Sequence, residues 1–260
     1  MTATWFQDKS RALLRIAGDD AHDFLQDLVT NDLDRLTDEN LVYAALLTPQ
    51  GKYLFDFFVG KEPDGALFID VAANRAAALA QRLSMYRLRR KVEISARDSA
   101  ITLCWGGERP EGSRPDPRHP DLGWRLYAAA PPQGAVLASR AEIDARRVAL
   151  LVPETGIELI PDESYILEAG FERLHGVDFR KGCYVGQEVT ARMKHKTELK
   201  KGLARVAIDG AASPGAPIEA EGKPAGVLHT VAGPEALAHL RFDRAGGQMR
   251  AGEATLRRLG

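Results

Sequence analysis

The sequence has very little cysteine, and this shortage excludes two kinds of protein. Cys104 and Cys183 are the only cysteines among 260 residues, so the chain has no disulfide framework of the kind that holds small secreted domains. Two thiols also cannot hold an iron–sulfur cluster alone, because such clusters generally need about four thiolate ligands. A role in cluster chemistry would therefore require a site shared with a partner.

Long apolar runs and net charge are missing as well. No apolar run approaches the roughly 20 residues of a membrane span, and the N-terminus lacks the charged-then-apolar pattern of a signal peptide. We therefore expect a cytoplasmic protein with no membrane partner. A net charge of −1 is unlike the strongly basic balance of many nucleic-acid-binding proteins, so direct nucleic-acid binding is not expected.

The hydrophobic content of 45% and charged content of 27% are typical of a globular protein. The first part of the chain alternates strand patterns with two helical patterns, which predicts an α+β domain of antiparallel sheets covered by helices. Asn74 is a candidate cap for the second helix. Strands are expected at 12–16, 42–47, 53–59, 67–71, 92–94, 101–105 and 124–128, and helices at 19–28, 74–86 and 135–148.

The sequence changes character near residue 202. Short apolar pieces alternate with turn clusters such as Asp209-Gly210 and Gly233-Pro234, a pattern typical of a small β-barrel. We expect a first domain over residues 1–198 and a barrel domain over residues 199–260.

The most informative stretch is Arg180–Glu188, which places Cys183 between Gly182 and Gly186. Gly182 can adopt backbone angles that other residues avoid, and good helix formers follow from Tyr184 onward. We expect Cys183 to lie at or just before a helix start, beside Lys181 and Arg180, where a thiolate is favoured. The alternative is that Cys183 is a small buried apolar residue.

The string Lys181-Gly182-Cys183-Tyr184-Val185-Gly186-Gln187-Glu188 resembles the K-G-C-Y-x-G-Q-E signature of the YgfZ-type folate-binding family. These proteins are relatives of the glycine-cleavage T-protein, an aminomethyltransferase, and act in iron–sulfur cluster assembly or repair. Other segments fit the same family, including Thr30-Asn31-Asp32 and Thr48-Pro49-Gln50-Gly51-Lys52. The resemblance implies a T-protein-like folate-binding domain with a ferredoxin-like part, followed by a C-terminal barrel.

The resemblance also implies a tetrahydrofolate ligand. Glu168 is the candidate for the pterin, since a carboxylate can accept two hydrogen bonds from its amino-pyrimidine edge; the alternative is a charged first-turn or surface residue. For Asn31 and Asp32 the interpretation as ordinary turn residues after a helix is favoured over ligand contact. Cys183 and Lys181 are the candidate reactive residues. The candidate folate contacts are Glu168, Lys181, Gly182, Tyr184, Gly186, Gln187, Glu188, Arg192, Asn31 and Asp32.

By this resemblance the chain is a monomeric, folate-binding accessory protein for iron–sulfur enzymes, including those that modify tRNA. Folate would occupy a cavity closed by Glu168 and the Lys181–Glu188 loop, with Cys183 at its mouth. No metal site is expected, because His195 has no second ligand at suitable spacing.

The main alternative is an aminomethyltransferase or another one-carbon transferase, whose chemistry needs a carboxylate near the folate. The resemblance to T-proteins implies an aspartate a few residues after Asn74, but Arg75 and three alanines stand there, which favours the accessory role. A thiol oxidoreductase lacks a second nearby cysteine. An RNA-binding module lacks aromatic residues among its basic ones.

Overall fold

The computed structural model describes residues 2–128, 134–195 and 198–259. The chain forms two compact units. Unit 1 combines residues 1–138 with 172–187, and unit 2 combines residues 139–171 with 188–260. The predicted domain boundary at residues 198 and 199 stays a prediction.

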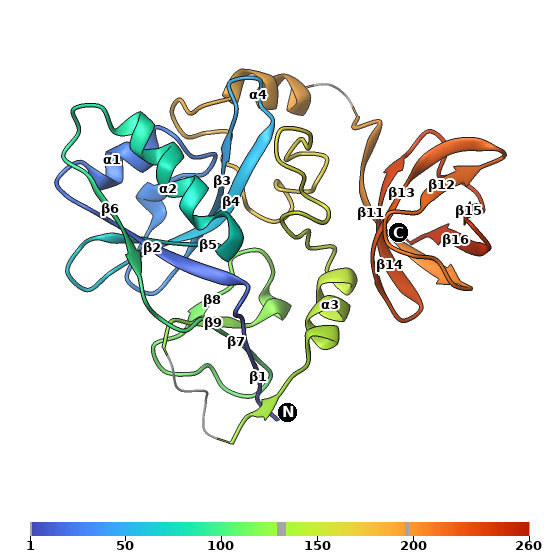
Figure 1. Cartoon of the computed structure of the whole chain (residues 1–260), viewed down its shortest axis with the longest axis horizontal. Coiled ribbons are helices and arrows are strands. Elements are labelled where there is room, and N and C mark those ends of the chain that lie inside the picture. The colour runs from blue at the N-terminus through green and yellow to red at the C-terminus, as the bar shows by residue number, and fades with distance from the viewer. Residues whose placement is uncertain (1, 129–133, 196–197, 260) are drawn as a thin grey trace. The chain divides into compact units, whose positions relative to one another are not determined.

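Unit 1 contains an antiparallel five-stranded sheet in the order β3-β4-β5-β2-β6. Helix α2 lies across β2, β5 and β6 (Figure 1). Side chains from α1, α2 and the sheet form one hydrophobic core, with Phe24, Phe57 and Leu83 almost fully buried. The elements are β2 Arg11–Ala17, α1 Ala21–Gln26, the 3-10 helix η1 Leu33–Arg35, β3 Val42–Leu47, β4 Tyr53–Lys61, β5 Leu67–Ala72, α2 Ala73–Arg87 and β6 Glu93–Arg97.

A second five-stranded sheet of unit 1 has the order β10-β1-β7-β9-β8. Its β1–β10 pair is parallel and its other pairs are antiparallel. Its elements are β1 Thr4–Gln7, β7 Thr102–Trp105, β8 Arg114–Pro115, the 3-10 helix η2 Pro120–Leu122, β9 Trp124–Leu126 and β10 Val136–Leu137.

A buried ion pair joins the two sheets of unit 1. Asp70 on β5 accepts hydrogen bonds from Arg125 on β9 at 2.8 and 3.0 Å and from Arg11 at 2.5 Å. Burial disfavours the charged carboxylate, but the two guanidinium groups outweigh this cost and hold the pKa of Asp70 below its usual value. Such a network is satisfied only when both sheets are in place, so it favours one arrangement of them.

Unit 2 contains a closed barrel with the strand order β11-β14-β13-β12-β15-β16, and its core is formed by apolar side chains including Val206, Leu228 and Leu256. The prediction of an α+β protein with a C-terminal barrel is therefore confirmed. The elements of unit 2 are α3 Arg140–Ala149, α4 Gln187–His195, β11 Lys201–Asp209, β12 Pro217–Ala220, β13 Lys223–Ala232, β14 Glu235–Arg241, β15 Met249–Ala251 and β16 Ala254–Arg258, with Gln187 itself counted in unit 1.

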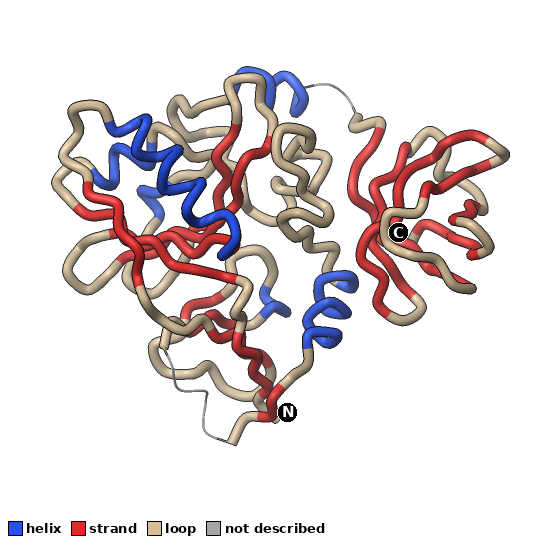
Figure 2. Tube along the Cα trace, viewed as in Figure 1, coloured by secondary structure: helices blue, strands red, loops and turns tan. Residues whose placement is uncertain are grey.

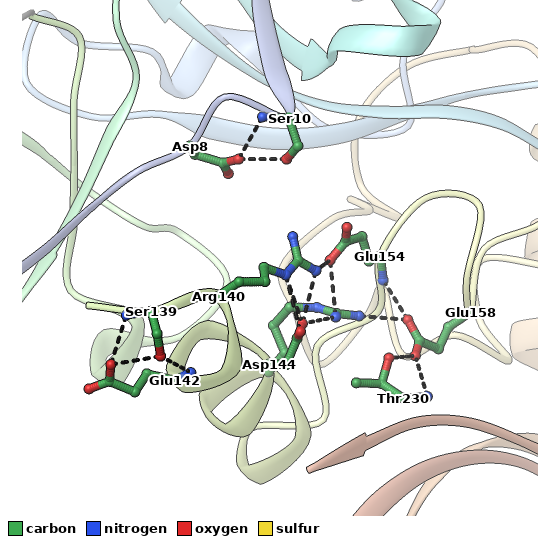
Figure 3. A network of polar contacts seen from close by, with 10 residues as sticks. Asp8, Ser10, Ser139, Arg140, Glu142, Asp144, Glu154, Glu158 and Thr230 are labelled. Atoms are coloured by element: carbon green, nitrogen blue, oxygen red, sulfur yellow. Dashed lines mark hydrogen bonds and ion pairs between the residues drawn. The ribbon is translucent and has the colours of Figure 1, made fainter. Parts of the chain in front are cut away.

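Helix α3 packs on the barrel and carries a polar network (Figure 3). Val148 packs with Leu203 and Leu237. Arg147 pairs with the buried carboxylate of Glu158 at 2.6 Å, and Glu158 accepts a hydrogen bond from the Thr230 hydroxyl at 2.5 Å. Residues 139–171 therefore stabilise the barrel from outside its strands.

Four predicted helix starts are wrong. The helix predicted at 19–28 begins at Ala21, with Asp20 as its N-cap. The other three are wrong for the following local reasons. The helix predicted at 135–148 begins at Arg140, because Ser139 forms a capping box with Glu142. Asn74 lies inside α2, whose N-cap is Ala72 without a side-chain cap. The helix predicted from Tyr184 begins at Gln187, because Gly186 has a φ of +83°, outside the helical range.

Candidate functional site

The candidate site is the loop before α4, which presents Cys183 to solvent. No regular helix or strand lies between Leu150 and Gly186 (Figure 2). Cys183 is exposed, whereas Cys104 on β7 is buried. Burial raises the pKa of the Cys104 thiol to about 11, so Cys104 is protonated at neutral pH. Cys183 is therefore the accessible thiol, and its alternative reading as a buried apolar residue is wrong.

Lys181 does not lie beside the thiol as a free cation. Its side chain is buried, and its Nζ donates hydrogen bonds to three backbone carbonyl oxygens: that of Gln26 at 2.6 Å, that of Val29 at 2.7 Å and that of Asn31 at 3.0 Å. Burial lowers the pKa of Lys181 to about 8, although nearby carboxylates, first that of Asp32, act to raise it. We call these three oxygens the carbonyl cage.

The turn Thr30-Asn31-Asp32 fastens the segment that leads to the thiol. The Thr30 hydroxyl donates to the Gly176 carbonyl at 2.7 Å, and the Asn31 amide donates to the carbonyls of His175 at 2.7 Å and Tyr43 at 2.8 Å. Both Thr30 and Asn31 are buried. Two motifs that are about 150 residues apart in the sequence therefore form one structural unit.

Asp178 adds a further connection to this turn. Its backbone N–H donates to the Thr30 carbonyl at 3.0 Å, its side chain accepts from the Arg180 N–H at 2.6 Å, and its carboxylate pairs with Arg35. The sequence interpretation missed Asp178, because an isolated acid in a loop has no distinguishing pattern.

Asp32 acts within its own turn. Its carboxylate accepts from the Gln26 side chain at 2.7 Å and from the Asp34 N–H at 3.2 Å, which caps η1. Burial opposes the charged form, but these hydrogen bonds outweigh it and lower the pKa of Asp32. The turn interpretation explains these contacts of Asn31 and Asp32, and their contact with folate stays a prediction.

The two glycines of the loop differ in what they require. Gly182 has no positive φ, and a Cβ added there would meet nothing within 4 Å, so the structure does not use the backbone angles that are open to glycine there. Gly186 has a φ of +83°, and an added Cβ would lie 2.6 Å from the Thr48 carbonyl oxygen and 3.1 Å from Gly51. Gly186 therefore packs against the hairpin turn that follows β3.

The remaining candidates lie in different surroundings. Tyr184 is buried, with the Lys181 Nζ 5.6 Å from its ring centre, and Gln187 is half-buried at the start of α4. Glu188 and Arg192 are exposed residues of α4 and belong to unit 2. Glu188 lies in the first turn of α4, as predicted. Their predicted roles toward folate are not decided by these positions.

Glu168 also belongs to unit 2. Its carboxylate lies 3.5 Å from the Lys201 ammonium and 3.4 Å from His239 Nε2, and its backbone carbonyl accepts from the Leu203 N–H at 2.7 Å. The side chain is 12% exposed, unlike an ordinary surface glutamate. The predicted folate cavity between Glu168 and the thiol loop stays a prediction.

The sequence interpretation also missed a buried carboxylate in unit 1. Asp56 on β4 accepts hydrogen bonds from the hydroxyls of Tyr53 at 2.7 Å and Tyr43 at 3.0 Å. The search for an acid was confined to the residues after Asn74, so it overlooked this strand residue. The signal available was a single acid, Asp56, between Phe55 and Phe57 in an otherwise apolar strand pattern.

Within the described residues, no group of three or more histidine, cysteine, aspartate or glutamate side chains is arranged to hold a metal ion. In the same part of the chain, no helix is long and apolar enough to cross a membrane.

Comparison with known structures defines the class of protein first. The glycine cleavage system aminomethyltransferase T from Bartonella henselae superposes with a TM-score of 0.81 over all of this chain and 85% of that one, at 14% identity. Residues 200–258 match the family described as the CAF17 C-terminal beta-barrel domain. The fold is therefore that of an aminomethyltransferase with a CAF17-type barrel, as predicted.

Sequence relatives then identify the family. The chain is 32% identical to the mitochondrial iron-sulfur cluster assembly factor IBA57 of Mus musculus, over 95% of this chain and 80% of that protein. It is also 32% identical to the IBA57 homolog of Neurospora crassa, over 74% of this chain and 51% of that protein. The chain belongs to the IBA57 family of iron–sulfur cluster assembly factors.

Two qualifications follow from these relatives. The chain spans 51% and 60% of the length of the fungal relatives from Neurospora crassa and Mycosarcoma maydis. The predicted cytoplasmic location is wrong, because the names of the relatives place them in mitochondria. The absence of a secretory signal pattern argued only against secretion and could not distinguish these two compartments.

Proposed function

We propose that this chain supports the assembly or repair of iron–sulfur enzymes through the Cys183 thiol. The observation that carries the proposal is the exposure of this one thiol on a loop whose neighbouring residues are fixed by buried hydrogen bonds. Membership of the IBA57 family supplies the biological setting. Because the chain has two cysteines and one is buried, a partner protein supplies the remaining ligands of any cluster.

In this role the thiolate of Cys183 coordinates iron transiently, or attacks a disulfide of the partner, forming a mixed disulfide and releasing a partner thiolate. Thiolate is the form that acts in both reactions. The proposal has three further parts. The chain acts as an accessory protein rather than in aminomethyl transfer, it is of the YgfZ type, and the enzymes that it supports include those that modify tRNA.

The test is complementation of cells that lack the endogenous protein. Cys183→Ala is expected to lose support of iron–sulfur enzyme activity, whereas Cys104→Ala is expected to retain it. Full activity with Cys183→Ala would remove the thiol from the mechanism. Immunoblots for the protein would show that both variants accumulate equally.

We also propose that the chain binds a tetrahydrofolate. The aminomethyltransferase-like fold and the partly buried carboxylate of Glu168 support this part. Titration calorimetry with tetrahydrofolate is expected to show saturable binding that Glu168→Gln weakens. Glu253→Gln, at an exposed turn of the barrel, is the matched control. Absence of binding by the unaltered protein would remove folate from the proposal and leave the thiol role standing.

A further inference from the structure

We propose that the Lys181 ammonium is a positioning group for the Cys183 thiol, acting as an internal cation that fixes the loop through the carbonyl cage. The inference rests on the proposed role of Cys183, because positioning matters only if the thiol acts. It assigns Lys181 a task different from activating the thiolate or meeting a ligand.

The first argument is the match between donors and acceptors. A lysine ammonium carries three N–H donors and no acceptor, and three carbonyl oxygens lie within 3.0 Å of the Lys181 Nζ. The Gln26 carbonyl belongs to the last residue of α1, where helix carbonyls lack partners within the helix. The ammonium therefore supplies a donor to each of the three oxygens, and the Gln26 Oε1 lies at 3.4 Å as a more distant acceptor.

The second argument is the position of the cage relative to the thiol along the chain. Lys181 and Tyr184 are buried, and only the exposed residues Gly182 and Cys183 lie between them. A Cβ added at Gly182 would meet nothing within 4 Å, so no packed group lies on that side of the residue. The direction of the thiol is therefore set by the buried residues on either side of it, which are Lys181 on the N-terminal side and Tyr184 on the C-terminal side.

The third argument excludes a simpler view, in which Lys181 serves only to fill space. A methionine or leucine would occupy the space of the Lys181 side chain at lower desolvation cost than a buried ammonium. Four carboxylates also act on this ammonium: those of Asp27, Asp32, Asp34 and Asp178. The site is built for a cation with N–H donors.

The test uses chemical rescue of the full chain with Cys183 carrying a trifluoroacetonyl label, observed by fluorine NMR. Cys104 is buried and is not expected to take the label, and Cys183→Ala serves as the blank. The unaltered protein is expected to give one sharp resonance. Lys181→Ala is expected to shift and broaden it toward the position seen in urea.

Lys181→Ala removes three carbons and the amine, which n-propylammonium replaces. Addition of n-propylammonium is expected to restore the original resonance in a saturable manner. Addition of n-propanol, which is of similar size but uncharged, is expected to leave the resonance shifted and broad. Arg180→Ala, at the exposed neighbouring residue, is the matched substitution and is expected to leave the resonance unchanged.

Three results would overturn the inference: an unchanged resonance in Lys181→Ala, equal rescue by n-propanol, or an equal effect of Arg180→Ala. If Lys181→Ala does not fold, Lys181→Met is used instead, because methionine keeps most of the side-chain volume but has no N–H donor. This variant is expected to show native circular dichroism and the same loss of the sharp resonance. Because the readout involves no iron–sulfur enzyme, its outcome is separate from complementation by Cys183→Ala.

Discussion

At Lys181, a basic residue two positions before a thiol has its ammonium bound to backbone oxygens. These oxygens compensate only part of the cost of removing the ammonium from water, as the lowered pKa shows. Proximity in sequence to Cys183 did not predict these partners, because the contacts of a side chain depend on what the chain folds against.

The Lys181 pKa predicts a pH dependence of stability. It is about 8 in the folded protein and near 10.5 in the unfolded chain, so between these values the unfolded chain binds more protons. The free energy of unfolding should therefore gain a rising contribution from Lys181 as the pH increases through this window. Urea unfolding at several pH values should show that the free energy of unfolding rises more steeply with pH in the unaltered protein than in Lys181→Met. Equal slopes would contradict a lowered pKa.

The two glycines beside the thiol provide a matched pair at the same scale. Gly186→Ala should destabilise the protein by about 2 kcal/mol or more, because alanine disfavours a positive φ and its Cβ would clash with the Thr48 carbonyl. Gly182→Ala should change stability by less than about 1 kcal/mol. Thermal unfolding of both variants measures the difference, and similar losses would show that the hairpin turn does not constrain Gly186.

At the scale of elements, the loop that carries Cys183 is supported by contacts between the turn after α1 and residues 175–178, rather than by a regular helix or strand. The turn after α1 has buried side chains that bond to backbone groups of residues 175–178. Residues 172–187 contain only the first residue of α4, so their backbone groups depend on such partners.

Asn31→Ala should therefore weaken the support of the thiol loop. The change leaves the buried carbonyl of Tyr43 and the carbonyl of His175 without this donor, which should cost about 1–3 kcal/mol. Hydrogen exchange measured by mass spectrometry should show faster exchange in residues 175–186 than in the unaltered protein. Asn74→Ala, at an exposed position of α2, is the control, and unchanged exchange in Asn31→Ala would show that the turn does not hold the segment.

At the scale of the whole molecule, the sequence segments of the two units interleave. Residues 139–171 belong with the barrel, and residues 172–187 return to unit 1. The exposed cysteine and the buried one both lie in unit 1, and Cys104 is only 2% exposed there.

The whole molecule should therefore protect one thiol and present the other. A thiol-reactive chromogenic reagent should modify one cysteine rapidly in the native protein and two after unfolding in urea. Cys183→Ala should abolish the rapid phase and leave the slow one. Rapid reaction of two thiols in the native protein would mean that β7 opens readily.

The sequence by itself determined the strands of the sheet β3-β4-β5-β2-β6 and the presence of the barrel, whereas β1, β8 and β10 were not predicted. Strand alternation and turn clusters are local, so β3 and β5 were predicted to within a residue, and the consecutive Lys181–Glu188 match was specific enough to indicate the fold and the role in iron–sulfur cluster assembly. Helix starts were less accurate, because Ser139 and Gly186 decide them through cap and φ geometry rather than through composition.

Only the tertiary structure decided what the residues near the thiol contact. That Lys181 bonds to the end of α1, and that Asn31 bonds to residue 175, are contacts between distant parts of the chain that no local pattern encodes. The same holds for Asp56, whose hydroxyl partners come from the pairing of β3 with β4 and from its own strand. The physical reason is that burial and hydrogen-bond partners depend on the packing of whole elements, whereas propensity and periodicity act over a few residues.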